Sequence, residues 1–291
     1  MGIFDTRGVG FVELCKRTFK AFGDDDMSTY AAALAYRALF ALFPFLLFLI
    51  ALLGFLHVPQ FFDWLRQQAA MALPSQALEQ VNPVIDQLQS QNTGVMSIGV
   101  LIAIWTASVG VRSLINAMNK AYGVDEGRPI WKLFILSILY TIGIAIMLLA
   151  VAGLMILGPQ AVQWLADRVG IGSLFVTIWT WVRWPAIVLL LMLVVAVVNY
   201  LMPDVKQQFR FITPGSAVAV IVWIVASIAF GLYVRNFGNY DATYGSIGAI
   251  IILLFYFYIS SAVLLLGVEM NAVIEHASAD GKNPGQKEAV T

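Results

Sequence analysis

The feature that most constrains the fold is a series of long apolar segments separated by short polar stretches. Of the 291 residues, 60% are hydrophobic and 12% are charged, whereas a soluble domain has about 25% charged residues. A helix of about 20 apolar residues crosses the hydrocarbon core of a bilayer, which is about 30 Å thick. Six segments reach or approach that length: residues 31–56, 95–117, 133–157, 184–202, 212–234 and 245–270. The sequence therefore predicts an all-α membrane protein with six transmembrane helices.

The segments outside these spans indicate short helices at the membrane surface. Residues 1–27 form an N-terminal arm in which residues 11–22 place apolar and charged side chains on different faces at helical spacing. We expect external helical segments at residues 58–93 and 158–183. Residues 276–291 are polar and contain Gly and Pro, which predicts a disordered tail.

The distribution of Lys and Arg predicts the orientation of the chain. Eleven of the 17 lie in the N-terminal arm, in the turns after the second and fourth spans, and in the tail. Four lie on the opposite side, and the remaining two, Arg37 and Arg112, lie within spans. Because basic residues are enriched on the cytoplasmic side of membrane proteins, we expect both termini in the cytoplasm.

Polar residues from four spans are expected to share one layer near the cytoplasmic face. With this orientation the first span runs outward and the second, fourth and sixth run inward, so their polar residues reach a similar depth. The candidate layer comprises Arg37, Arg112, Asn116, Asn199, Glu269 and Asn271. A charge at this depth is costly unless it is paired or hydrated, so we expect Glu269 to face Arg112 or Arg37.

This layer has two interpretations. In the first, it is a polar vestibule, open to the cytoplasm, that binds an ion or a polar head group. In the second, it is an ion pair with asparagine hydrogen bonds that locks the helices together, since buried pairs often have no other role. The sequence leaves both open.

A second polar group lies in the predicted turn between the fifth and sixth spans. Its members are Arg235, Asn236, Asp241 and Tyr244. They form either an external gate or a hydrogen-bonded turn that holds the last two helices together.

The sequence shows none of the motifs that we associate with catalysis. The two histidines, His57 and His276, are predicted on opposite sides of the membrane, and the single cysteine, Cys15, excludes an intrachain disulfide. We find no phosphate-binding loop, dinucleotide fingerprint or Ser-His-Asp constellation, and no basic groove with interleaved aromatic residues. We therefore expect no enzyme activity, no cofactor, no metal site and no nucleic-acid partner.

Three stretches carry a resemblance to a known family. They are AAALAYRALFALFPFLL in the first span, WTASVGVRSLINAMNKAYGVDEGRPIW after the second, and YDATYGSIGAIIILLFYFYISSAVLLLGVEMNA near the end. Together they cover about residues 25–275 and resemble the YihY/BrkB family of bacterial inner-membrane proteins, formerly mislabelled ribonuclease BN. Arg37 departs from the pattern, because an uncharged residue is expected there. The resemblance implies a multi-pass helical protein of the bacterial cytoplasmic membrane, in a family with members associated with serum resistance or proposed as transporters or lipid-related factors.

Two functions fit this sequence. The first is a transporter or export component that moves a small polar or amphiphilic solute or a lipid, which requires a water-accessible cavity lined by Arg112, Asn199 and Glu269. The second is a non-transporting scaffold in envelope integrity that docks a partner through the external helix at residues 74–92. The lipid bilayer is the partner in either case, and the sequence leaves open whether the chain forms a homo-oligomer.

Overall fold

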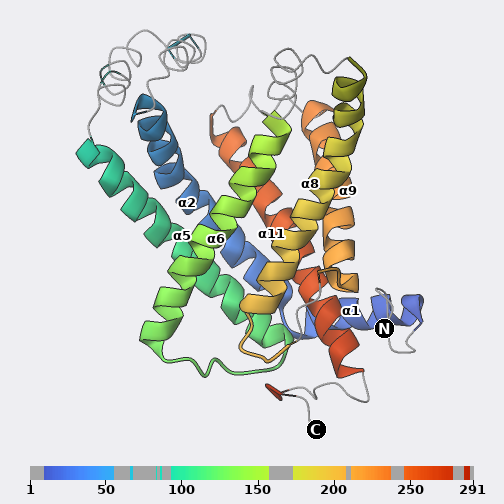
Figure 1. Ribbon diagram of the computed structural model, residues 1–291. Helices are drawn as coiled ribbons and strands as arrows, with labels where there is room; N and C mark the ends of the chain where they lie inside the picture. The colour runs from blue at the N-terminus through green and yellow to red at the C-terminus, as the bar shows by residue number, and fades with distance from the viewer. Residues whose placement is uncertain are drawn as a thin grey trace. The chain divides into compact units, whose positions relative to one another are not determined.

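The computed structural model describes residues 10–55, 66–67, 83, 86, 93–156, 173–207, 211–236, 246–277 and 285–288. Its main elements over this part of the chain are helices, shown in Figure 1. They are α1 (Phe11–Asp24), α2 (Met27–Phe55), α5 (Thr93–Ala121), α6 (Ile130–Ile156), α8 (Ser173–Leu201), α9 (Pro214–Asn236) and α11 (Ser246–His276).

The all-α membrane fold predicted from the sequence is confirmed. Among the described residues, five helices are long and apolar enough to cross a membrane: α5, α6, α8, α9 and α11. The remaining predicted span corresponds to α2, which has 29 residues and continues through Pro44. At about 1.5 Å per residue this helix exceeds the thickness of the hydrocarbon core.

The fourth spanning helix is longer than its apolar core suggested. We expected residues 158–183 to be external and the span to begin at residue 184, but α8 begins at Ser173 and continues through Pro185 to Leu201. A proline removes one helical hydrogen bond, and membrane helices tolerate this loss where neighbouring groups satisfy the freed carbonyl. Residues 173–183 therefore belong to the same helix as the span.

The chain divides into two compact units. The larger contains residues 1–36 and 111–291, and the smaller contains residues 37–110. Both α2 and α5 contribute to each unit. In the smaller unit, Arg37 Nη1 donates a hydrogen bond to the carbonyl of Val109 at 2.9 Å, which links α2 to α5.

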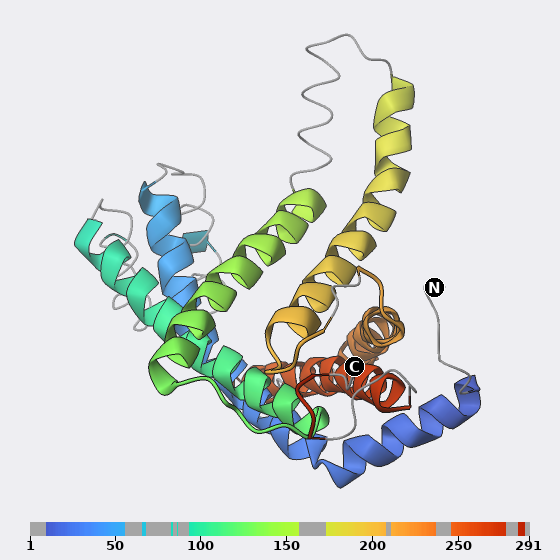
Figure 2. The same cartoon turned by 60° about the horizontal axis from the view of Figure 1, so that its bottom comes forward.

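The core of the larger unit forms from parts of the chain that are far apart in sequence. Met27 from α2, Ile115 and Met118 from α5, Met202 after α8 and Leu265 from α11 are all at most 1% exposed and belong to one hydrophobic cluster. Within this unit α6 packs beside α8, and α9 beside α11 (Figures 1 and 2).

Helices α9 and α11 approach each other at two glycines. A Cβ atom on Gly215 would overlap the carbonyl oxygen of Gly267, and a Cβ atom on Gly267 would lie 2.6 Å from the carbonyl oxygen of Gly215. Small residues allow this close contact between membrane helices. The two glycines therefore determine how closely α9 and α11 pack.

Helix α1 has one face on the protein and one face exposed. Leu14 is 1% exposed and packs with Met270 and Ile274 of α11. Phe11 and Phe19 are 66% and 65% exposed. Figure 1 shows α1 lying across α11 near the C-terminal end of that helix. This arrangement suits an amphipathic helix at a membrane surface.

Candidate functional site

Glu269 is a buried carboxylate in a membrane-spanning helix. Glu269 is 1% exposed, and its Oε1 atom has no hydrogen-bond partner in the part of the chain that the structure describes. The charges that act on it are those of Asp25 and Lys120, which pair with each other at 3.2 Å between Nζ and Oδ1. Burying a polar atom without a hydrogen-bond partner costs free energy, so Glu269 is the strongest candidate for a binding group.

Asn199 is the second buried polar residue whose side chain is unsatisfied among the described residues. It is 5% exposed, and both its Oδ1 and Nδ2 atoms lack a hydrogen-bond partner. Its backbone carbonyl accepts a hydrogen bond from Gln207 Nε2 at 3.2 Å. An unsatisfied buried amide costs about 1–3 kcal/mol, and native proteins satisfy most such groups. Asn199 is therefore available to bind a polar ligand.

Arg112 contacts α6. The expected ion pair with Glu269 is not among the contacts of the described residues. Arg112 Nη1 donates to Ser137 Oγ at 2.8 Å, and its guanidinium lies over the Phe134 ring, 5.1 Å from the centroid. A hydroxyl acceptor and an aromatic face on α6 both stabilise a guanidinium, so this expectation is corrected.

The other predicted members of the layer lie in different surroundings. Arg37 belongs to the smaller unit, where it contacts Val109, and Asn116 is exposed. Asn271 Oδ1 accepts a hydrogen bond from Gly215 N at 2.9 Å, so its side chain caps the start of α9. Of the six predicted residues, Glu269 and Asn199 thus retain the strongest case for ligand binding.

The candidate external gate falls largely outside the described residues. Asp241 and Tyr244 lie outside them, and the side chains of Arg235 and Asn236, the last residues of α9, do as well.

The sequence reasoning missed a polar network that joins two loops. Arg128 contacts both carboxylate oxygens of Glu126, at 2.6 Å and 2.7 Å. Asn119 Nδ2 donates to Glu126 Oε2 at 3.0 Å, and the same asparagine accepts from the backbone N–H of Asp204 at 2.7 Å. The Asp204 carboxylate accepts from Gly127 N at 2.9 Å. These contacts hold the α5–α6 connection against the α8–α9 connection. In the sequence, the only signal of the network is the spacing of Glu126 and Arg128, two oppositely charged residues separated by one position.

Part of the C-terminal tail joins this network. Lys287 forms an ion pair with Asp204, and its carbonyl accepts from Lys206 N at 2.8 Å. Glu288 pairs with Lys206 at 2.6 Å. We expected a disordered tail at residues 276–291, but residues 285–288 make specific contacts, because two charged loop residues lie within their reach.

Charge interactions in the network perturb its carboxyl groups. Burial acts to raise the pKa of Glu126, but hydrogen bonds from Arg128 outweigh it and the pKa lies below its ordinary value. For Asp204, burial likewise acts to raise the pKa, and the ion pair with Lys287 and the Gly127 hydrogen bond lower it overall. Both carboxyl groups are therefore held in their charged form.

Tyr122 connects the loop region to the end of α11. Burial, with the nearby carboxylate of Glu275, raises the pKa of its hydroxyl far above the ordinary value, against a hydrogen bond with Gln207. Its ring meets that of His276 edge to face, with the centroids 6.4 Å apart. A neutral, hydrogen-bonded tyrosine thus lies beside the polar end of α11.

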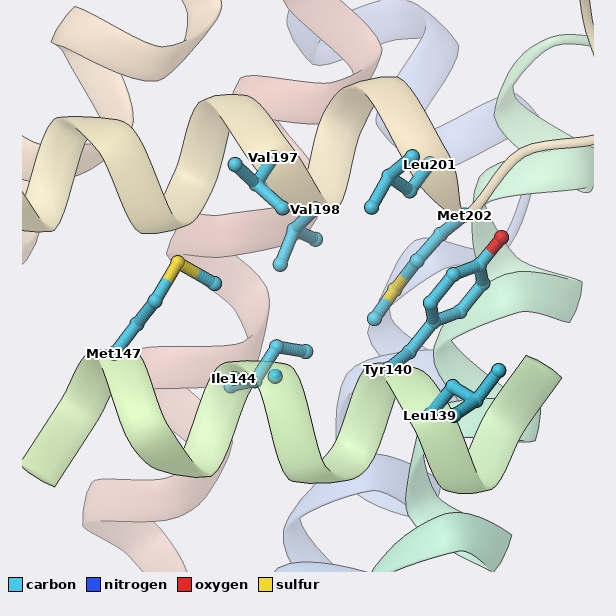
Figure 3. Close-up of a pocket in the computed structure, with 9 residues that line it drawn as sticks. Leu139, Tyr140, Ile144, Met147, Val197, Val198, Leu201 and Met202 are labelled. Atoms are coloured by element: carbon cyan, nitrogen blue, oxygen red, sulfur yellow. The ribbon is translucent and has the colours of Figure 1, made fainter. Parts of the chain in front are cut away.

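A small apolar cavity lies between α6 and α8 and is shown in Figure 3. Its volume is about 80 Å³. It is lined by Leu139, Tyr140, Gly143, Ile144, Met147, Val197, Val198, Leu201 and Met202. Arg112, Asn199 and Glu269 are not among the lining residues. Among the residues that the structure describes, no group of three or more His, Cys, Asp or Glu side chains is placed to hold a metal ion.

Comparisons with known proteins agree with the membrane fold. The family model described as virulence factor BrkB matches residues 18–291. A Bacillus subtilis protein that carries the name ribonuclease-like protein YfkH is 35% identical over 260 residues, covering 89% of this chain and 94% of that protein. A UPF0761 membrane protein of Xanthomonas oryzae is 24% identical over 263 residues, covering 87% of this chain and 58% of that protein. No solved structure matches.

Proposed function

The chain belongs to the virulence factor BrkB family and is an integral membrane protein, and we propose that it moves a small polar or amphiphilic solute or a lipid across the bacterial cytoplasmic membrane. In this proposal both termini lie in the cytoplasm, as the excess of Lys and Arg in the arm, the loops and the tail indicates. Glu269 and Asn199 then bind the polar part of the substrate, or a coupling cation, from the cytoplasmic side.

The observation that carries this proposal is the burial of Glu269 without a hydrogen-bond partner for Oε1 among the described residues. An ionisable residue inside a membrane-spanning helix is costly, and such residues commonly mark the path of a substrate or an ion. A purely structural carboxylate would be expected to have its hydrogen bonds satisfied within the protein. The amide of Asn199 is a second buried polar group that is unsatisfied among the described residues.

Solute flux in proteoliposomes tests the proposal. Wild-type protein and the Glu269→Gln variant are reconstituted, and uptake is measured for a panel of ions, osmolytes and fluorescent phospholipids. We expect flux of at least one solute by the wild type and a loss of at least about tenfold in the variant, which corresponds to about 1.4 kcal/mol. Full flux by a folded Glu269→Gln variant would contradict the role of this residue.

The matched control is Glu13→Gln. Glu13 is half-exposed on α1 and pairs with Arg17, so its neutralisation removes the same amount of charge from an exposed surface and leaves the buried carboxylate of α11 unchanged. We expect its flux to equal that of the wild type. If no solute in the panel moves with wild-type protein, the transport proposal itself fails.

The scaffold alternative depends on a docking helix at residues 74–92. Apart from Pro83 and Asp86, which is paired with Arg66 at 2.7 Å, this segment lies outside the described residues. No observation therefore favours it over transport, although Arg112, Asn199 and Glu269 do not line the cavity described between α6 and α8, so the transport proposal rests on the burial of Glu269.

We propose no ribonuclease role for this chain, although the Bacillus relative carries a ribonuclease-like name. The proposal rests on the sequence, in which the histidines His57 and His276 are isolated from any nucleophile or metal-binding motif. Incubation of the purified protein with labelled RNA tests it, and RNA cleavage that copurifies with the protein would contradict it.

A further inference from the structure

The cavity between α6 and α8 lies at membrane depth. Both helices are long and apolar enough to span the bilayer. The lining comes from Leu139 to Met147 on α6, from Val197 to Leu201 at the end of α8, and from Met202 directly after α8. Figure 3 shows the apolar side chains of the two helices pointing toward each other across the space. A cavity of this kind is favourable for hydrocarbon and unfavourable for water.

The α6 side of this cavity continues into an exposed apolar surface. Ile135, Leu139 and Ile146 are 50%, 57% and 61% exposed. In a membrane-spanning helix, exposed side chains of this type face lipid chains. The surface beside the cavity is therefore suited to contact with acyl chains.

Gly143 determines the depth of the cavity on the α6 side. A Cβ atom at this position would have no heavy atom within 4 Å, and Gly143 is one of the lining residues. The absent side chain leaves a gap in the helix surface, and a larger side chain at this position would extend into the space between the helices.

The side chain of Lys132 lies on the same face of α6 as one end of the cavity. Lys132 is exposed in the first turns of α6, seven residues before Leu139, so the two residues lie on the same helix face about 10 Å apart along the axis. Lysine at the end of a span extends to the head-group region and attracts phosphate. Tyr140 places its hydroxyl at the end of the cavity nearest Met202 (Figure 3), so the lining also becomes more polar toward the loops.

We propose that the α6–α8 cavity binds a short segment of one acyl chain of a phospholipid from the adjoining leaflet, with the phosphate of that phospholipid paired to Lys132. The occupant is a phospholipid because the lining is apolar, the surrounding medium is a bilayer, and the cation lies within one phospholipid's reach of the cavity. This is a lipid-binding site that stands independently of transport through the Glu269 region.

Photo-crosslinking in vesicles tests the site. The full chain is reconstituted in phosphatidylethanolamine and phosphatidylglycerol vesicles that contain a trace of phosphatidylglycerol with a diazirine on one acyl chain. After irradiation, labelled peptides are identified by mass spectrometry. We expect label on the α6 and α8 segments that line the cavity, reduced by excess unlabelled phosphatidylglycerol.

Two variants distinguish the contribution of the acyl chain to binding from the contribution of the phosphate. Gly143→Leu fills the cavity and is expected to reduce labelling of α6 and α8 to the background of other lipid-facing segments. Lys132→Gln is expected to weaken labelling about fivefold, since one cation near the surface contributes about 1 kcal/mol. Gly231→Leu is the matched control, because Gly231 lies in α9, and a Cβ there also meets nothing within 4 Å; its labelling should equal that of the wild type.

Several outcomes would overturn this proposal. They are equal labelling of wild type and Gly143→Leu, wild-type labelling that unlabelled lipid does not reduce, and crosslinks that join α6 to a second copy of the chain. The competition experiment uses wild-type protein alone, so it decides the question even if Gly143→Leu does not fold.

Discussion

At the scale of single residues, similar polar side chains have different roles in this protein. Asn271 is two residues from Glu269 and caps α9 through Gly215 N. Asn199 and Glu269 are buried with unsatisfied atoms among the described residues. The hydrogen bond to Gly215 N satisfies the side-chain oxygen of Asn271 without any ligand, whereas Asn199 and Glu269 have buried polar atoms without such a partner among the described residues. The candidate site therefore narrows to Glu269 and Asn199.

The glycine crossing provides a prediction at the same scale. In Gly267→Ala the new methyl group would lie 2.6 Å from the Gly215 carbonyl oxygen and 2.7 Å from Ala219 Cβ, so α9 and α11 must separate. We expect a loss of about 1–3 kcal/mol in the free energy of unfolding, as for other overpacked contacts. The free energy of unfolding of the variant and of the wild type is measured in detergent, with circular dichroism as the signal.

Gly231→Ala is the control for this substitution. A Cβ at Gly231 meets nothing within 4 Å, and alanine has the higher helix propensity by about 1 kcal/mol. We expect no loss of stability. Equal destabilisation of both variants would show that the effect arises from the helix itself and that the α9–α11 contact is not its cause.

At the scale of elements, the start of α9 is determined by local sequence and by one distant residue. Thr213 and Ser216 form a reciprocal capping box, with Ser216 N donating to Thr213 Oγ1 at 3.1 Å and Thr213 N donating to Ser216 Oγ at 2.9 Å. Pro214 occupies the first helical position, where its missing N–H carries no cost. Asn271 of α11 then satisfies the next N–H.

Thr213→Ala should destabilise the start of α9. Loss of an N-cap side chain costs about 0.5–2 kcal/mol, and hydrogen exchange in the first turn of α9 should increase in proportion. The matched control is Thr106→Ala, because Thr106 Oγ1 donates a hydrogen bond to the carbonyl of Ile102 within its own helix and caps no helix start. If exchange at α9 is unchanged in Thr213→Ala, the capping box does not limit the opening of this helix.

At the scale of the molecule, the loops of the larger unit are joined by charge. The Glu126–Arg128 pair, Asn119 and Asp204 connect two loops, and Lys287 adds the tail. The α5–α6 connection, the α8–α9 connection and the C-terminal segment therefore form one polar assembly outside the spans. Movement of either loop would have to break several charge-assisted hydrogen bonds.

This assembly predicts a dependence of stability on pH. The pKa of Asp204 is lower in the folded protein than its ordinary value of 3.8, so its stabilising contribution is complete above that value. The contribution is lost as the pH falls through the lower, folded-state pKa. We expect Asp204→Asn to be less stable than wild type at neutral pH and to lose less stability between about pH 5 and pH 3.

Unfolding midpoints in detergent across this pH range measure the effect. Glu13→Gln serves as control, because the Glu13–Arg17 pair is half-exposed and exposed pairs contribute little. Parallel pH profiles for wild type and Asp204→Asn would contradict the role of Asp204 in the loop assembly.

The sequence patterns predicted the helices more accurately than they predicted the contacts between side chains. The apolar segments located the spans, and helical spacing identified α1, because both signals are local. The start of α8 was misplaced because a local count treated residues 173–183 separately from the apolar run after Pro185. The expected pairing of Glu269 with Arg112 or Arg37 is not among the contacts of the described residues, where Arg112 bonds Ser137 and Arg37 bonds Val109. Depth along the membrane carries no information about which way each helix turns its side chains.

What the sequence by itself determined is the class of the protein: an all-α membrane protein, because about 20 apolar residues can satisfy their backbone groups in a bilayer only as a helix. Which polar residues are paired and which are left unsatisfied was decided only by the tertiary structure. Because α9 packs on α11, the side chain of Asn271 accepts a hydrogen bond from the start of α9. Arg112 donates a hydrogen bond to Ser137 of α6. Glu269 was left buried, because its surroundings depend on helices that are more than a hundred residues apart in the chain.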